Sequence, residues 1–327
     1  MTSQFGLRSF SNLVTEIHAM ATETDSEGLA RWMVGELSEK IGFECAWYGW
    51  AQIDASGVQI HANATLNLPD DYFSFWMSMA DEDLLAERLL ECPWTIATYD
   101  RRSGRQTDGM TTLSDRYGLD KIATVMNHRK GRLASFYLSS YRIGKGARAF
   151  SASEQEYLQC AVEQLGHSMK LCALSGESVQ ANGTISILVN ENGIGILGLG
   201  NLRDQLGDLW PEWKGDLLPE RLRGLLSKPG HHVLHDQGVV VTCEKASDFK
   251  GMGLRRLTMR RMSVVDHLSP REKEIARLLA KGKSHKEVAR LLGLAPSTVR
   301  NQTQSIYDKA RIGSRAELAS LIQSAGC

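Results

Sequence analysis

The spacing of apolar and polar residues predicts a mixture of helices and strands over the first 175 residues. Apolar residues flank two turn-forming segments, Asp54-Ala55-Ser56-Gly57 and Lys130-Gly131, which predicts two hairpins. Apolar residues three and four positions apart recur in four longer segments, and this spacing predicts amphipathic helices. The predicted strands are residues 43–53, 58–66, 121–129 and 133–141, and the predicted helices are residues 8–21, 27–41, 70–90 and 153–174.

Residues 182–262 predict a smaller unit built mainly from strands. A strand comes first, and Asn192-Gly193 forms the hairpin turn that leads into a second strand. Leu218-Pro219 then opens a short helix. The Ser, Gly, Glu and Asn residues of the 174–183 segment predict a linker before this unit. The remaining predicted strands are residues 232–234, 238–244 and 254–261.

The last 60 residues have helical spacing throughout and predict four short helices. Three times a Ser is followed three positions later by a Glu, which is the spacing of a capping box. Pro270 stands at a first helical position, and Gly282 and Gly293 stand where the first two helices should end. The pairs are Ser269/Glu272, Ser284/Glu287 and Ser314/Glu317, and a fourth pair, Ser153/Glu156, is expected to open the long helix at 153–174.

Each of the four helices has one apolar stripe, and the third also has a polar face. The predicted buried residues are Ile275, Leu278 and Leu279, then Val288, Leu291 and Leu292, then Val299, Ile306 and Ala310, and finally Leu318, Leu321 and Ile322. Arg300, Asn301 and Gln304 lie on the opposite face of the third helix, and we predict that they contact DNA bases, because forked Arg and amide groups match guanine and adenine edges. The predicted phosphate contacts are Lys283, Ser284, Lys286, Ser297 and Thr298.

Charge distribution supports this interpretation. The chain contains 38 Lys and Arg and 38 Asp and Glu residues, so its formal net charge is zero. Residues 260–327, however, hold 13 Lys and Arg against 6 Asp and Glu. A basic C-terminal segment on an otherwise acidic chain is suited to binding the phosphate backbone of double-stranded DNA.

Residues 268–322, LSPREKEIARLLAKGKSHKEVARLLGLAPSTVRNQTQSIYDKARIGSRAELASLI, resemble the LuxR-type (GerE-like) DNA-binding domain. The resemblance implies a four-helix helix-turn-helix domain over residues 263–327 that binds operator DNA as a homodimer, with RNA polymerase as a further partner. Ala295 stands where the family usually has a capping Ser or Thr, and Gln302 where it often has His. The matching residues are Leu268, Pro270, Arg271, Glu272, Glu274, Gly282, Lys286, Glu287, Ala289, Gly293, Leu294, Thr298, Val299, Ile306, Tyr307, Lys309, Ser314, Arg315, Glu317 and Leu318.

Residues 1–175 resemble a GAF-like ligand-sensing domain of LuxR-type regulators. The segment FSASEQEYLQCAVEQLGHSM is similar to the last helix of such domains. The segment LPDDYFSFWMSMADEDLLAERLLECPW resembles the aromatic helix and acidic turn of acyl-homoserine-lactone receptors, although Asp83 is followed by Leu84 where that family has Pro. Residues 182–262 resemble a PAS-like coupling domain, which could bind a ligand, dimerise or transmit a signal. The expected fold class is therefore α+β and multidomain.

Aromatic side chains are concentrated in the first domain, where four of the seven Trp residues of the chain lie between positions 47 and 94. Such side chains can line an apolar pocket, but they also fill ordinary cores, which is the simpler interpretation for any one of them. As a group they predict a small apolar effector, aromatic or acyl-bearing. The candidate ligand-binding residues are Trp47, Tyr48, Trp50, Tyr72, Phe75, Trp76, Asp83, Trp94, Met126 and His128.

Several other classes of protein are not expected. No run of 18 apolar residues occurs and no basic start precedes an apolar run, so we expect neither a membrane span nor a signal peptide, and a cytoplasmic location. The six Cys residues are scattered and His61 and His128 have no second ligand at useful spacing, so we expect no metal site and no cofactor.

The sequence thus predicts a ligand-responsive, non-enzymatic transcriptional regulator. A two-component response regulator would need a receiver domain with an acidic pair after its first strand, whereas the first 60 residues begin with two helices. An enzyme with a regulatory DNA-binding segment is the other alternative, but no nucleophile elbow, metal signature or paired catalytic carboxylates occur.

Overall fold

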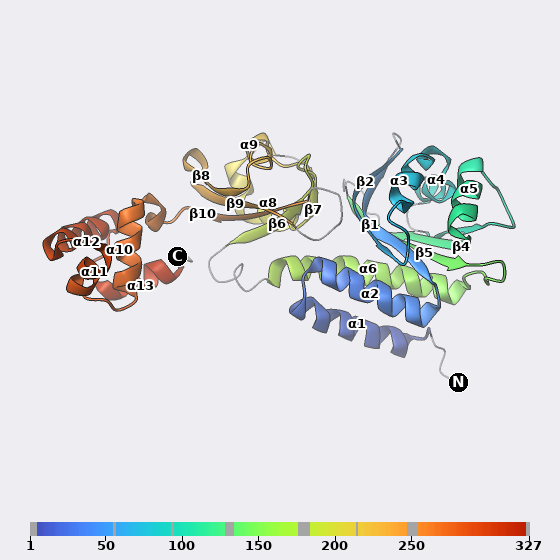
Figure 1. Cartoon of the computed structure of the whole chain (residues 1–327), viewed down its shortest axis with the longest axis horizontal. Helices are drawn as coiled ribbons and strands as arrows, with labels where there is room; N and C mark the ends of the chain where they lie inside the picture. The colour runs from blue at the N-terminus through green and yellow to red at the C-terminus, as the bar shows by residue number, and fades with distance from the viewer. Residues whose placement is uncertain are drawn as a thin grey trace. The chain divides into compact units, whose positions relative to one another are not determined.

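The computed structural model describes residues 5–54, 57–92, 95–127, 134–175, 184–213, 215–246 and 254–324. The predicted α+β class is confirmed: two five-stranded sheets with associated helices precede a C-terminal group of helices (Figure 1). The described residues fall into two compact units. One contains residues 1–176, 186–230 and 243–257, and the other contains residues 177–185, 231–242 and 258–327.

The first sheet has the strand order β2-β1-β5-β4-β3, and its neighbouring strands are antiparallel. Four of its strands lie close to the predicted positions, whereas β3 was not predicted. One irregularity interrupts the β1–β2 pairing: Trp50 pairs with Ala62 and Ala51 pairs with Ile60, which leaves His61 as the extra residue of a β-bulge. The strands are β1 (Cys45–Asp54), β2 (Gly57–Leu66), β3 (Ala97–Asp100), β4 (Leu119–Met126) and β5 (Ser135–Ile143).

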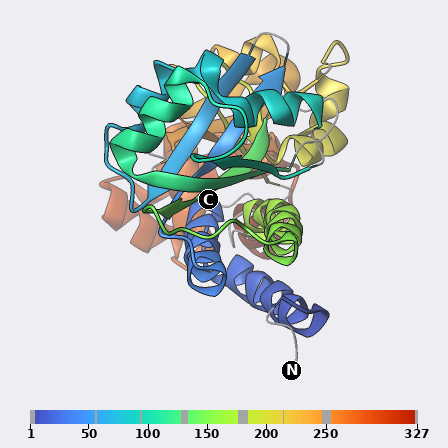
Figure 2. The ribbon, with the colours of Figure 1, turned by 90° about the vertical axis from the view of Figure 1, so that its right-hand side faces the viewer.

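Helices cover both faces of this sheet (Figure 2). On one face lie α1 (Leu7–Glu23), α2 (Ser26–Ile41) and α6 (Ala152–Ser175), and on the other lie α3 (Tyr72–Met77), α4 (Leu84–Glu91) and α5 (Asp108–Tyr117). Because successive side chains of a strand point to opposite faces, β1 contributes to two separate cores. Tyr48 and Trp50 join the core beneath α1, α2 and α6, whereas Trp47 and Ala51 join the core beneath α3, α4 and α5.

The helix predicted at residues 70–90 is divided into α3, a 3-10 turn (Ala80–Glu82) and α4. Asp83 causes the division, because its carboxylate caps α4 by accepting hydrogen bonds from the backbone N–H groups of Leu85 and Ala86. Helix α5 was missed although its signals are present. Thr107 caps its start, and Gly118 ends it in the left-handed conformation, with φ of 69°.

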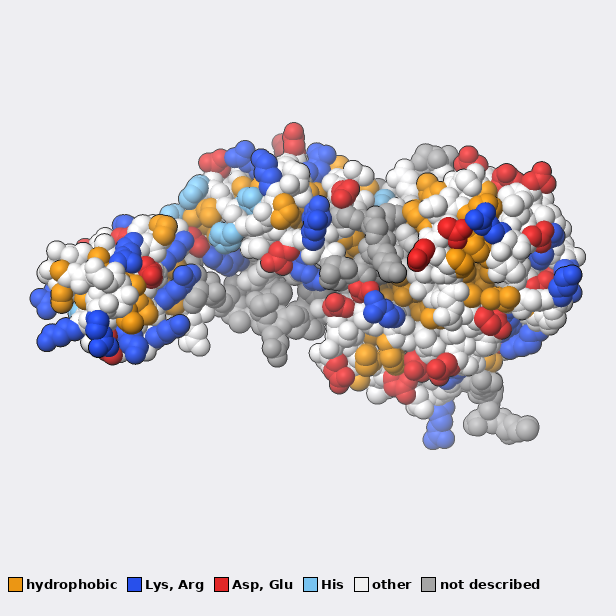
Figure 3. Space-filling model, in the orientation of Figure 1, with side chains coloured by type: hydrophobic (Ala, Val, Ile, Leu, Met, Phe, Trp, Pro, Cys, Tyr) orange, Lys and Arg blue, Asp and Glu red, His pale blue; other side chains and the backbone are white. Residues whose placement is uncertain are grey.

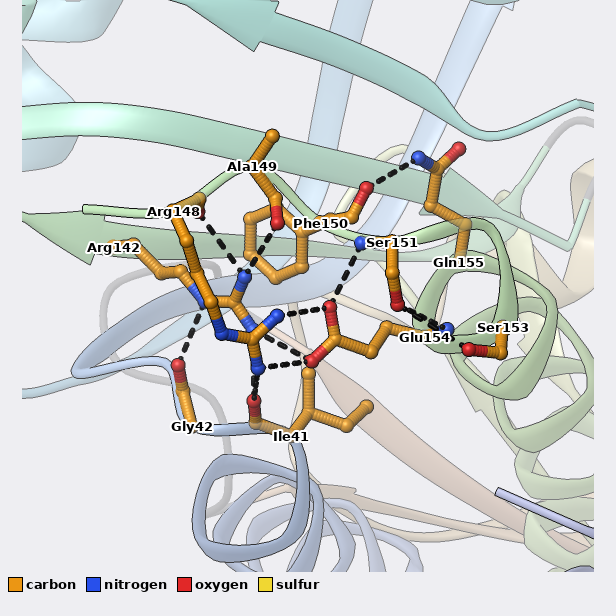
Figure 4. Close-up of polar contacts among 10 residues, drawn as sticks. All are labelled: Ile41, Gly42, Arg142, Arg148, Ala149, Phe150, Ser151, Ser153, Glu154 and Gln155. Carbon is orange, nitrogen blue, oxygen red and sulfur yellow. Dashed lines mark hydrogen bonds and ion pairs between the residues drawn. The ribbon is translucent and has the colours of Figure 1, made fainter. Parts of the chain in front are cut away.

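The capping box predicted at Ser153/Glu156 is wrong, and the correct pair is Ser151/Glu154. The backbone N–H of Ser151 donates to Glu154 Oε2 at 2.8 Å, and the helix begins at Ala152. Glu154 is buried in this position because two Arg side chains neutralise it (Figure 4). Arg142, stacked on the ring of Phe150, also donates to the backbone carbonyls of Ile41 and Gly42, so one cluster joins the end of α2, strand β5 and the start of α6.

The second sheet has the order β7-β6-β10-β9-β8, which repeats the order of the first sheet when the strands are counted from its own beginning. The predicted Asn192-Gly193 turn joins β6 to β7, with Gly193 at φ of 82°. The elements are β6 (Ile185–Val189), β7 (Gly195–Leu197), α8 (Leu199–Leu206), α9 (Glu220–Arg223), β8 (Gly230–Leu234), β9 (Val239–Lys245) and β10 (Arg255–Arg261).

The C-terminal domain consists of α10 (Pro270–Ala280), α11 (His285–Leu292), α12 (Pro296–Ala310) and α13 (Arg315–Ser324). The capping boxes that open α10 and α11 are both present, and Gly293 ends α11 in the left-handed conformation. At α13, the Ser314 hydroxyl oxygen accepts Glu317 N–H and the hydroxyl donates to Glu317 Oε1, but Glu317 Oε2 accepts from the backbone N–H of Gly313 rather than from that of Ser314. The predicted burial of Leu291 is wrong, since it is 55% exposed and Ala289 is buried instead.

A short connection leads from the second sheet into this domain. Arg260 of β10 donates to both carboxylate oxygens of Asp266, at 2.6 and 2.8 Å. Asp266 also accepts from Ser263 N–H at 2.7 Å and lies in the 3-10 turn Val264–His267, whose Val265 is fully buried in the helical core. Burial would raise the pKa of Asp266, but these donors lower it to about 2. The Asp266 carboxylate therefore holds the connection to the end of β10.

Candidate nucleic-acid interface and aromatic core

Helix α12 presents a polar face that faces away from the helical core. Val299, Thr303 and Ile306 are buried, whereas Arg300, Asn301 and Gln304 are exposed on the other side of the helix. The side chains of Arg300 and Asn301 make no hydrogen bond within the described residues, so their donors and acceptors are open to another molecule. Gln304 differs, because its Nε2 donates to Asp308 Oδ1 at 2.9 Å and would have to leave that bond to reach a base.

The orientation of α12 is held by a carboxylate of α10. Glu272 is buried, caps α10 through Ser269 N–H and accepts from Ser305 of α12 at 3.1 Å. Its closest cation is Lys309, near the end of α12. The hydrogen bonds from Lys309, aided by Ser269 and Ser305, lower the pKa of Glu272 to about 2 in spite of its burial. Glu272 therefore fixes α12 at two positions along its length, Ser305 and Lys309.

The predicted phosphate contacts gather at the start of α11 and α12. Lys283, Ser284 and Lys286 are exposed at the first of these, and Ser297 and the half-buried Thr298 at the second. The Ser284 hydroxyl oxygen accepts Glu287 N–H at 3.3 Å, so its proton is still available to a phosphate. In Figure 3, Lys and Arg side chains surround the part of the surface that belongs to α10–α13.

Two basic residues of this domain have internal roles that the sequence pattern did not reveal. Arg271 donates to Leu292 O at 2.7 Å, and Arg315 donates to Leu279 O and Lys283 O at 2.7 and 2.6 Å. Leu292 and Leu279 lie in the last turns of α11 and α10, where carbonyl groups have no partner within the helix itself, and Lys283 lies in the turn between these helices. The charge of Arg271 and Arg315 is thus used to hold helices together, and the basic excess overstates the number of cations that can reach DNA.

The aromatic residues of the first domain are divided by its sheet. Trp47 lies at the centre of the group beneath α3 and α4, with ring centroids 4.7 Å from Trp76, 5.1 Å from Tyr137 and 5.6 Å from Tyr72. Phe75 is half-buried at the edge of this core, and Met126 is buried in it. Tyr48 and Trp50 belong to the core on the opposite face, so they do not line the same space, and Trp94 and His128 lie outside the described residues.

Polar groups are enclosed among these rings. The hydroxyls of Tyr72 and Tyr141 hydrogen-bond to each other at 2.7 Å, and burial raises the pKa of both. The hydroxyl of Tyr137, on the same face of β5 as Tyr141, is buried and has no hydrogen-bond partner within the described chain. A buried polar group without a partner costs free energy, and a ligand or water could supply one. Sequence reasoning missed Tyr137 and Tyr141, because a β-strand Tyr that faces a pocket has the same pattern as one that fills a core.

Asp83 lies against the edge of this core. Trp76 Nε1 donates to Asp83 Oδ2 at 2.9 Å, and the two capping N–H groups of α4 donate to Oδ1. Burial raises the pKa of Asp83, although these three donors oppose the shift. Both oxygens therefore have partners from the chain itself, and an effector that used this carboxylate would compete with the indole of Trp76.

A groove of about 570 Å³ opens beside α4 and β3. None of the described aromatic candidates lines it, and its walls carry charges of both signs. Arg105 in the wall pairs with Glu87 at 2.7 Å. The lining residues are Leu84, Glu87, Arg88, Glu91, Cys92, Thr95, Thr98, Tyr99, Asp100, Ser103, Gly104 and Arg105.

The part of the chain that the structure describes lacks two kinds of feature. No helix there is long and apolar enough to span a bilayer. Within the same residues, no three His, Cys, Asp or Glu side chains come together in an arrangement that could hold a metal ion.

Comparison with known proteins identifies the C-terminal domain. Residues 266–322 match the family described as bacterial regulatory proteins, luxR family (GerE). A protein of Aeromonas salmonicida, described as an HTH-type transcriptional regulator in the exeN 3′ region, is 43% identical over 56 residues. The match spans 17% of this chain and 29% of that protein, so it concerns the DNA-binding domain alone.

Solved structures give broader but weaker likenesses. Escherichia coli SdiA is 13% identical, with a TM-score of 0.40, and the alignment covers 97% of this chain and 98% of SdiA. The phycoerythrobilin-bound GAF domain of a cyanobacterial phytochrome is 16% identical, with a TM-score of 0.37, over 50% of this chain and 96% of the domain. CepR2 of Burkholderia cenocepacia, an N-acylhomoserine lactone-dependent factor, is 11% identical, with a TM-score of 0.36, over 49% and 93% of the two chains. With TM-scores below 0.5, these likenesses say nothing about what the chain binds.

Proposed function

Because its C-terminal domain belongs to the luxR family of bacterial regulatory proteins, we propose that the chain is a cytoplasmic transcriptional regulator that binds operator DNA. The observation that carries this proposal is the face of α12, where Arg300 and Asn301 are exposed and have no partner within the described residues. Arg300, Asn301 and Gln304 read base edges in the major groove. Lys283, Ser284, Lys286, Ser297 and Thr298 bind the flanking phosphates.

The active species is a homodimer that spans two half-sites. One helix-turn-helix domain makes few base contacts, and two-fold pairing multiplies them. Helix α13 supplies the first pairing surface. Helix α6 is a weaker candidate than its length suggests, because α1 and α2 pack on it. Among its described side chains, those exposed beyond the first turn form a narrow polar strip, Glu156, Glu163 and His167. RNA polymerase is the partner through which the bound dimer acts on transcription.

The first domain senses a small apolar effector, aromatic or acyl-bearing, in the core beneath α3 and α4. Trp47, Tyr72, Trp76 and Met126 supply apolar surface there. Tyr137 supports this assignment, since its buried hydroxyl has no partner within the described residues and an effector with one polar group would satisfy it. Phe75 and Asp83 border the same space, and the remaining candidates, Trp94 and His128, stay predictions. Tyr48 and Trp50 support the sheet from its other face.

The DNA-binding part is tested by selection from a random duplex library with the full chain, followed by affinity and stoichiometry measurements on the recovered sequence. We expect an inverted repeat, two protomers per duplex and a much weaker affinity for random DNA. Recovery of no sequence, or binding that does not discriminate between the recovered and random duplexes, would contradict the proposal. One protomer per duplex would contradict only its dimeric form.

The sensing part is tested by Trp fluorescence and thermal unfolding of the full chain during a screen of aromatic and acyl compounds. A compound that binds only the folded chain at a hundred times its Kd raises stability by about 2.7 kcal/mol. Trp76→Ala should abolish that stabilisation while leaving DNA affinity without the compound unchanged. A compound that stabilises the Trp76→Ala variant equally binds elsewhere, and the groove beside α4 and β3 would then be the first place to examine.

A further inference from the structure

The β-bulge of the first sheet directs one side chain toward the second sheet. His61 is the extra residue of β2 at this bulge and is buried. Its Nδ1 lies 3.2 Å from Nδ2 of Asn190, which is also buried and follows β6 in the second sheet. Bulges commonly redirect a side chain out of the alternating pattern of a strand. Here the redirected imidazole meets Asn190, the residue that directly follows β6.

The direction of this hydrogen bond follows from the turn in which Asn190 lies. Oδ1 of Asn190 accepts the backbone N–H groups of Asn192 and Ile194, at 3.0 and 2.9 Å. The amide group is therefore oriented with its Nδ2 toward His61, and Nδ2 can only donate. His61 Nδ1 must then be the acceptor, so the imidazole is neutral at that nitrogen when the bond is made. His61 of β2 is thus hydrogen-bonded to the side chain that organises the β6–β7 turn.

A second hydrogen bond connects His61's strand to the aromatic core. Trp47 Nε1 donates to Oδ1 of Asn63 at 3.2 Å, and Asn63 lies two residues after His61 on β2. The two strands approach closely here, because a Cβ in place of Gly49, which pairs with Asn63, would lie 2.0 Å from Ala62 O. Apolar contact accompanies the polar one, since Leu188, Ile196 and Leu197 belong to the same buried cluster as Trp50 and Ala62.

We infer that the contact between His61 and Asn190 couples two parts of the chain. Through it, a structural change in the aromatic core around Trp47 reaches the β6–β7 hairpin of the second sheet. Its regulatory meaning rests on the proposed function, in which that core receives the effector. The path runs from the indole of Trp47 through Asn63 and β2 to His61, and from there into the turn that Asn190 organises.

Hydrogen exchange of the full chain, followed by mass spectrometry on peptides covering residues 185–197, tests the contact. The labelling is done at pH 8, where imidazole is neutral in water. His61→Phe keeps a ring but removes the acceptor. Asn190→Asp keeps the oxygen that serves Asn192 and Ile194 but removes the donor. We expect each to raise exchange in these peptides roughly 2- to 10-fold, the factor that corresponds to one lost hydrogen bond, and the double variant to raise it no further.

His61→Gln is the rescue variant, since its carbonyl oxygen can accept from Asn190, and it should restore most of the protection. If His61→Phe leaves residues 185–197 unchanged, or if the two single effects add in the double variant, the contact does not couple the two elements and the inference fails. Should His61→Phe not fold, the comparison of Asn190→Asp with wild type, alone and combined with His61→Gln, answers the same question.

Transmission is tested by perturbing the core itself. Trp47→Phe removes the indole N–H while keeping an aromatic ring, and it should change exchange at residues 185–197 in the wild-type background but not in the His61→Phe background. Tyr99→Phe, which removes a side-chain hydrogen bond at the opposite edge of the same sheet, is the control and should have no effect there. An effect of Trp47→Phe that persists without His61 would overturn the inferred path. These measurements require no DNA, so failure of the proposed function would leave their result standing.

Discussion

Nζ of Lys309 donates to both carboxylate oxygens of Glu272, at 2.7 and 2.8 Å, across 37 residues of sequence. Glu272→Gln should therefore lower the stability of the C-terminal domain by about 1.5–3 kcal/mol, the range for hydrogen bonds to a charged group. The measurement is chemical unfolding of the full chain together with hydrogen exchange of α10 and α12. Glu274→Gln is the matched control, because Glu274 is exposed and makes only a surface pair with Arg271. Equal losses in the two variants would contradict the structural role of Glu272.

Acid should destabilise the chain in a defined pH range. The pKa values of Glu154, Asp266 and Glu272 are each lowered to about 2, because Arg or Lys donors outweigh burial. A carboxyl group whose pKa is lower in the folded state stabilises that state above its unfolded value and loses this contribution as the pH falls through its folded value. The free energy of unfolding should thus decline from about pH 4.5 towards pH 2. A titration of the urea midpoint that stays flat over this range would contradict these assignments.

Arg142 should matter more to the first domain than its neighbour Arg148. The side chains of Arg142 and Glu154 are 4% and 1% exposed, whereas that of Arg148 is 62% exposed. Breaking a buried pair by removing one partner costs roughly 3–5 kcal/mol. Arg142→Gln should approach this loss, since four backbone carbonyls lose a donor as well, and Arg148→Gln should cost about 1 kcal/mol or less. The thermal midpoints of the two variants check the order, and a larger effect at Arg148 would reverse our interpretation of the cluster.

The contribution of Asp83 to the free energy of unfolding should depend on pH with the opposite sign. Its pKa is raised by burial, so its ionised form disfavours folding at neutral pH and the folded state gains from this group as the pH falls. Asp83→Asn keeps one oxygen that can accept from the N–H groups of α4 but turns an NH2 group toward the indole N–H of Trp76. Because it also removes the buried charge, it should cost less stability at pH 7 than Asp83→Ala does. Asp83→Ala should cost about 1–3 kcal/mol, because it removes the helix cap and leaves the indole N–H unpaired. Equal destabilisation by both substitutions would show that the charge itself is needed.

Base reading by α12 is tested at Arg300. Arg300→Ala should cost roughly 1–3 kcal/mol on the duplex recovered by selection and much less on random DNA. Lys286→Ala, the comparison variant, should weaken both by a similar factor and reduce the salt dependence of binding, as expected for a phosphate contact. Equal losses on the two duplexes for Arg300→Ala would assign it to phosphate instead.

The features that could be predicted from the sequence are those fixed by local rules. Capping boxes, helix-ending glycines and the Asn192-Gly193 turn depend on residues within a few positions of one another, and the C-terminal helices and both sheets follow from them. Local spacing gave a wrong prediction where a residue distant in the sequence determines where a helix begins. Ser151 rather than Ser153 opens α6 because Arg142 of β5 holds Glu154 in the core.

The same limit applies to the aromatic candidates. Tyr48 and Trp50 flank Gly49 in the sequence, yet they lie across the sheet from Trp47, and only the strand's alternation combined with the positions of the helices separates the two cores. Short elements were also missed: β3 has four residues, and α5 is polar along much of its length. The polar, exposed side of α12 could be predicted because its polar stripe and its buried stripe lie within one helix.

The ion pair between Arg260 and Asp266 has a practical consequence for making chimeric regulators. The luxR-family match begins at Asp266, which makes the preceding residue an obvious place to join this DNA-binding domain to another sensor. Such a junction would discard Arg260 but keep its partner Asp266, whose buried carboxylate would lose that donor. The remaining donors to this carboxylate come from Ser263, which lies on the discarded side as well. A graft that begins at Arg260 would keep donor and acceptor together, and the transplanted domain should then melt at a higher temperature than one cut at the family boundary.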